Sequence, residues 1–126
     1  MCFAHDPENR RAIVLLKGID AILHSLRSHG QHPGIQAYGL GALGNLAVDD
    51  DNRGHILTAG AIDMVLRAMG EWQRDPRVQH FSCLALSNFA IDDKNKIAIG
   101  RAGGITLVLA AMKNLRSHPG VQEQAC

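Results

Sequence analysis

A 43-residue repeat runs through the chain and constrains its fold more than any other feature. The same residue type recurs at this spacing without a gap, as in Pro33, Pro76 and Pro119, Asn9, Asn52 and Asn95, Ile13, Ile56 and Ile99, and Gln36, Gln79 and Gln122. A period of this size is typical of solenoids, in which each unit covers its apolar face with a neighbour. We therefore divide the chain into units at 6–48, 49–91 and 92–126, the last of them incomplete.

Each unit is predicted to contain three helices. In unit two, the first helix begins near Asn52 after an acidic run that can cap it, and ends at Gly60. The third begins at Asp75-Pro76 and ends near Ala90. The second has one apolar face with i, i+3, i+4, i+7 spacing, made of Ile62, Val65, Leu66 and Met69. The fold class is therefore an all-α solenoid.

Unit one departs from this plan at its first turn, where Leu16-Lys17-Gly18 replaces Ala-Gly-Ala. A lysine is unfavourable in the left-handed conformation that ends such a helix, so we expect the turn to move to Gly18. The apolar residues that recur by period should be buried: Ile13, Ile19, Leu23, Leu43, Ile56, Ile62, Leu66, Leu86, Ile99, Ile105 and Leu109.

Composition and charge exclude several classes of function. Thirteen basic against twelve acidic residues give a net charge of +1, which argues against a nucleic-acid partner. No apolar run approaches the ~20 residues of a membrane-spanning helix, and the first residues lack the pattern of a signal peptide. Three cysteines without a pairing pattern indicate a reducing, intracellular compartment, cytoplasmic or nuclear. Cys83 is expected to be a small buried residue.

The sequence does not predict a metal site or a catalytic site. The closest histidine pair, His29 and His32, lacks the spacing of a zinc site, and His32 stands directly before a helix-opening proline. The runs 49–51 and 92–93 lack the spaced ligands of a calcium loop and are better explained as helix caps. Without a phosphate-binding loop or nucleophile motif, we expect no enzyme activity and no cofactor.

The segments Ala42-Leu43-Gly44-Asn45-Leu46-Ala47 and Ala85-Leu86-Ser87-Asn88-Phe89-Ala90, with the turn at 59–62 and the opening at 76–79, resemble armadillo repeats. The resemblance implies a right-handed superhelix whose third helices line a concave groove for extended peptides. Asn45 and Asn88 match the family's peptide-binding asparagines. Members that read nuclear signals have a tryptophan four residues earlier, where this chain has Gly41 and Leu84. HEAT repeats, which usually have two helices per unit, are the alternative.

Helical geometry places the same groove independently. At 100° per residue, Tyr38, Gly41 and Asn45 share one face of a third helix, while positions 40, 43 and 47 face the core. Phe81, Leu84 and Asn88 form the equivalent rung in unit two, and Gln124 begins a third. The alternative is that the asparagines merely bridge neighbouring helices.

We therefore expect a protein-interaction scaffold that binds an extended peptide in this groove. The alternative is a structural or self-assembling solenoid spacer without a peptide ligand. By alignment with the repeat, both the first and the last residues of the sequence are expected to belong to third helices, and neither end has a polar capping unit. This arrangement favours head-to-tail association of copies through an edge that includes Phe3 and Cys126.

Overall fold

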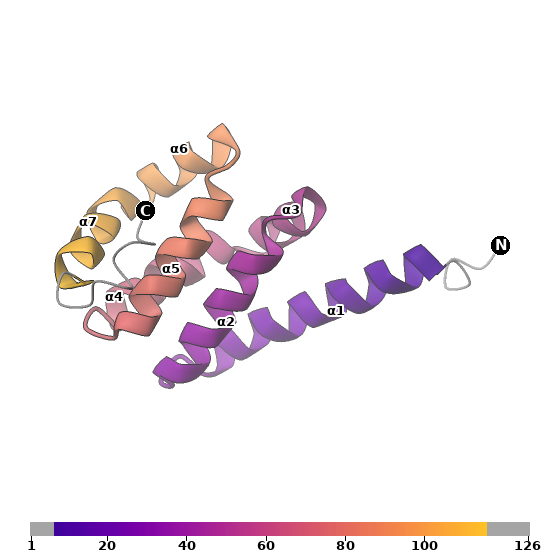
Figure 1. The fold of residues 1–126 in the computed structure, drawn as a ribbon, viewed down its shortest axis with the longest axis horizontal. Coiled ribbons are helices and arrows are strands. Elements are labelled where there is room, and N and C mark those ends of the chain that lie inside the picture. The colour runs from indigo at the N-terminus through magenta and orange to yellow at the C-terminus, as the bar shows by residue number, and fades with distance from the viewer. Residues whose placement is uncertain (1–6, 116–126) are drawn as a thin grey trace.

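The computed structural model describes the backbone of residues 7–115 and the side chains of residues 15–115. This range is all-helical, with seven helices and no strand (Figure 1). The helices are α1 (Pro7–Ser28), α2 (Pro33–Leu46), α3 (Asp50–Thr58), α4 (Ala61–Glu71), α5 (Pro76–Phe89), α6 (Asp93–Arg101) and α7 (Gly104–Asn114). The predicted fold class is confirmed at this level. None of these helices combines the length and apolarity that crossing a bilayer requires.

The repeat is visible in the helices themselves. Unit two consists of α3, α4 and α5 as predicted, and α6 and α7 repeat the first two of them. Gly60 and Gly103, which are 43 residues apart, make the same turn with φ of 87° and 85°. A left-handed backbone costs a residue with a side chain about 1–2 kcal/mol, so glycine suits this turn. Asp49 and Asp75 cap α3 and α5 with their carboxylates.

The prediction of a turn at Gly18 is wrong, because α1 is one continuous helix of 22 residues. Among the described residues, positive φ occurs only at Gly60 and Gly103. Lys17 occupies the repeat position of these two glycines and would be strained in their conformation. Gly18 continues the helix instead, so the first two helices of unit one are fused.

Most of the predicted core is confirmed. Seven of the recurring residues are at most 8% exposed: Ile19, Leu23, Leu43, Ile56, Leu66, Leu86 and Ile99. Cys83 is also fully buried, and Ile62 packs partly buried against the same core. Ile13 lies outside the described side chains.

Two core predictions are wrong, because Ile105 and Leu109 on α7 are 65% and 62% exposed. Their repeat equivalents on α4, Ile62 and Leu66, lie in a helix that packs against both α5 and α7. Within the described range no helix follows α7 that could pack against it as α5 and α7 pack against α4. Burial at these positions thus depends on the following unit and not on the residue itself.

Two buried glutamines explain another repeated position. Gln36 donates from Nε2 to the carbonyls of Leu26 and His29, both at 3.0 Å. Forty-three residues later, Gln79 donates to Met69 and Trp72 at 3.2 and 2.8 Å. Each glutamine satisfies carbonyls at the end of the preceding helix and so fixes how the third helix leaves it.

Arg53 links successive units and was not singled out in the sequence. The side chain is only 3% exposed, donates to the Ala47 carbonyl at 2.8 Å, and pairs with Asp50 and Asp92. Asp50, and then Asp92, raise the pKa of Arg53. The expected cap at Asp92 is therefore wrong in its detail, because the carboxylate stands at the start of α6 but accepts from Arg53 Nε at 3.2 Å.

Candidate functional site

The third helices of units one and two, α2 and α5, run side by side in the same direction (Figure 1). They contain six of the seven predicted groove positions, Tyr38, Gly41 and Asn45 on α2 and Phe81, Leu84 and Asn88 on α5. Gln124, Phe3 and Cys126 lie outside the described residues. We call the surface formed by Tyr38, Asn45, Phe81, Leu84 and Asn88 the concave face, after the groove predicted there.

Aromatic rings connect the two units on this face. The Tyr38 side chain is 67% exposed, and its ring centroid lies 6.4 Å from that of Phe81 with the planes tilted by 41°. His80 also contacts Phe81, edge to face, at 4.9 Å between centroids. The half-buried Phe81 ring is thus held in place while Tyr38 remains available for contact.

The prediction that Gly41 faces solvent is wrong. Gly41 is buried, and a Cβ atom there would lie 2.9 Å from Phe81 Cδ1. One turn later, a Cβ on Gly44 would lie 3.2 Å from the Cα of Ala85. The helices approach so closely because α2 presents glycines to α5. Gly41 is therefore covered by the Phe81 ring and is not available to contact a ligand.

The two asparagines differ in their surroundings. Asn88 donates from Nδ2 to the carbonyl of Gly44 at 2.7 Å and so bridges the two units, as one of the two interpretations of the sequence proposed. A carboxamide offers two N–H groups and an oxygen with two lone pairs, so this single bond leaves most of its capacity unused. Asn45 has an exposed side chain at the equivalent position of α2.

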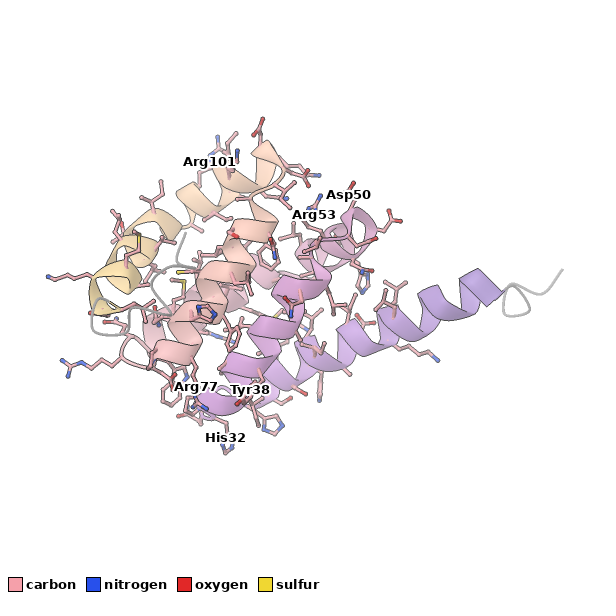
Figure 2. The ribbon with its side chains drawn as sticks, in the orientation of Figure 1. His32, Tyr38, Asp50, Arg53, Arg77 and Arg101 are labelled. Carbon is pink, nitrogen blue, oxygen red and sulfur yellow. The ribbon has the colours of Figure 1, made fainter. Side chains whose placement is uncertain are left out.

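One ion pair stands at the N-terminal end of the face. Asp75 accepts from the backbone N–H groups of Arg77 and Val78 at 2.9 and 3.2 Å, and its second oxygen meets Arg77 Nη2 at 3.4 Å. This contact with Asp75 is the main reason that the pKa of Arg77 is raised, and Tyr38 adds a smaller contribution. Figure 2 shows Tyr38 and Arg77 at the same end of the α2–α5 pair.

The face offers contact surface rather than reactive groups. Across the described part of the chain, no three His, Cys, Asp or Glu side chains gather closely enough to hold a metal ion. Helix α2 contains no charged residue, and α5 contains Arg77 alone besides the histidine. Apolar rings, carboxamides and one cation are groups that bind and orient a chain.

Comparisons with protein families, with curated proteins and with solved structures found no match for this chain.

Proposed function

We propose that this chain is a protein-interaction module of armadillo type, which binds an extended peptide segment on its concave face. The observation that carries the proposal is that Tyr38 and Asn45 on α2 match Phe81 and Asn88 on α5, in successive units and on adjacent helices. An aromatic ring and a carboxamide therefore recur at the same places in each unit. Such repetition is what a ligand with a regular backbone requires.

The chemistry of these groups suits a polypeptide ligand. An extended segment presents N–H and C=O groups at regular intervals, and a carboxamide can both donate to and accept from such a backbone. Tyr38 and Phe81 supply flat apolar contact for its side chains, and aromatic residues are enriched in interface cores. The proposal includes no catalytic role, because the face carries no arrangement of acid, base and nucleophile.

Peptide binding tests the proposal through Asn45. Its side chain is exposed and makes no bond that replacement by alanine would break within the described fold, whereas Asn88→Ala would also remove the bridge to Gly44. We expect Asn45→Ala to weaken binding on a peptide array by about tenfold, or about 1.4 kcal/mol. Asn52→Ala on α3 is the matched control and should bind like the wild type. An array on which no peptide binds, or on which Asn45→Ala changes nothing, would exclude the groove.

A specific observation also favours self-association. An open apolar hollow of 660 Å³ lies between α1 and the side of α2 turned away from α5. Ile22 of α1 and Ile35, Gly39 and Ala42 of α2 are in its lining, and Tyr38 stands at its edge with the concave face. The repeat equivalents of Ile35, Gly39 and Ala42 are Val78, Ser82 and Ala85, which are fully buried at the side of α5 that packs on α2. We therefore also propose that a helix of a second copy packs on this outer side of α2.

Sedimentation velocity over a range of concentrations tests this second candidate. Ile35 is 38% exposed, and Ile35→Glu would place a charge in the apolar hollow. We expect this variant to remain monomeric at concentrations where the wild type associates. Ile97→Glu on α6, at a site that is 55% exposed, is the control and should behave like the wild type. A wild type that is monomeric throughout would rule the contact out.

A further inference from the structure

The two helices of the concave face carry a single permanent charge. Of the 28 residues in α2 and α5, which have 14 residues each, Arg77 is the single one with a permanent charge. Its side chain is half exposed, with 50% of its surface accessible. The face therefore presents one cation in a surface of rings and carboxamides.

Although Asp75 pairs with this cation, Arg77 can still bind a carboxylate of a ligand. One of its oxygens accepts from two backbone N–H groups at the start of α5, where the positive end of the helix favours a negative charge. Only the other oxygen meets Arg77, at 3.4 Å, and the Asp75 side chain is 17% exposed. Asp75 is thus covered and committed to the cap, and it holds the guanidinium in a defined position with most of its five N–H donors available.

Tyr38 completes the arrangement from the neighbouring unit. Its side chain is close enough to Arg77 to contribute to the raised pKa of that residue, lies at the same end of the α2–α5 pair (Figure 2), and is 67% exposed. The Tyr38 ring is 6.4 Å from Phe81, between centroids. A guanidinium, a phenol and two aromatic faces therefore lie within reach of one bound side chain and its neighbour.

We propose that the segment bound on the concave face carries an acidic side chain, whose carboxylate pairs with Arg77 next to an apolar side chain on Tyr38 and Phe81. The inference rests on the proposed function and specifies its ligand class. A carboxylate can accept two parallel N–H bonds from a guanidinium, and this geometry is stronger and more specific than a single charged contact. A segment without the acid would take water from the exposed donors of Arg77 and leave the guanidinium with its single 3.4 Å contact to Asp75.

The charge on α2 and α5 argues against a basic peptide and against a nucleic acid as the ligand. A basic peptide would meet Arg77 and find no uncommitted carboxylate on α2 or α5. A nucleic acid would need several cations along its path, since each neutralised phosphate contributes to affinity, and the two helices supply one. The ligand that fits is a mostly apolar or neutral segment with an acidic residue.

A charge exchange tests the inference. Three pools of short peptides, identical except for Glu, Gln or Lys at one position, are titrated against the wild-type chain by fluorescence anisotropy. The wild type should prefer the Glu pool over the Gln pool by about three- to tenfold, and bind the Lys pool weakest. Arg77→Glu should reverse the order and favour the Lys pool. Arg77→Gln should lose the preference without reversing it, which separates the charge from the length of the side chain.

Arg67→Glu on α4 is the matched control, because it changes the net charge equally at an exposed residue outside the face. It should keep the wild-type order. An unchanged order in Arg77→Glu, or an equal reversal in Arg67→Glu, would overturn the inference while leaving peptide binding intact. Loss of every preference together with insensitivity to Asn45→Ala would instead show that the peptide proposal itself fails. Circular dichroism of each variant establishes that the helices are retained.

Discussion

Replacing glycine by alanine should have opposite effects at two neighbouring positions of the repeat, Gly18 and Gly60. An added Cβ would contact nothing within 4 Å at either site, so the difference is conformational and not steric. Gly18 lies inside the continuous helix α1, where alanine is favoured over glycine by about 0.5–1 kcal/mol. Gly60 has φ of 87°, where a side chain costs about 1–2 kcal/mol. The two variants should therefore differ in stability by about 1.5–3 kcal/mol.

Urea unfolding followed by circular dichroism measures this difference. If the slope of the transition is unchanged, a shift in midpoint reports the change in the free energy of unfolding. Gly18→Ala should move the midpoint to higher urea and Gly60→Ala to lower urea, with Gly103→Ala as a second destabilised case. A loss of stability in Gly18→Ala that equals the loss in Gly60→Ala would refute the reasoning, because it would place a left-handed turn at Gly18.

Two further predictions concern packing between units. Leu66→Ala should lower the free energy of unfolding by about 2–5 kcal/mol, because the side chain is 7% exposed and its loss leaves a cavity in the core around α4. A loss below ~1 kcal/mol in denaturant melts would contradict its place in the core. Gly44→Ala should lower the thermal midpoint although alanine has the better helix propensity, because its Cβ would lie 3.2 Å from the Ala85 backbone. Gly54→Ala should raise the midpoint, because an added Cβ there meets nothing within 4 Å. Equal shifts in the two glycine variants would show that the contact between α2 and α5 is looser than described.

The features that a single unit determines could be predicted from the sequence. The turn at Gly60 and the cap at Asp75 depend on residues within a few positions of each other, and both are found where the repeat placed them. The core residues of the middle unit follow from helical periodicity for the same reason.

The features that two units determine together could not be predicted in the same way. Gly41 is buried because Phe81, forty residues later, lies over it, and periodicity within one helix contains no such information. Ile105 is exposed although it matches Ile62, since burial there depends on neighbouring helices. For Asn88, the sequence allowed both a groove contact and a bridge, and the distance to Gly44 shows the bridge.

Arg53 is a case in which a signal was present but overlooked. Basic residues recur at positions 10, 53 and 96, one per unit, in helices that otherwise vary in charge. A charge that recurs with the period of the core suggests a structural contact between units, and Arg53 makes one with Asp92 of the next unit. Recurring polar positions therefore merit the same attention as recurring apolar ones.

Binding of an extended segment on the concave face can be mapped residue by residue. Amide resonances of the ¹⁵N-labelled chain are followed by two-dimensional NMR during titration with the Glu-containing peptide pool. We expect shifts to concentrate on α2 and α5, at Tyr38, Asn45, Phe81 and Leu84, and to diminish in Asn45→Ala. Shifts that gather instead on α3, α4 or α6, or a titration without shifts, would contradict binding on this face.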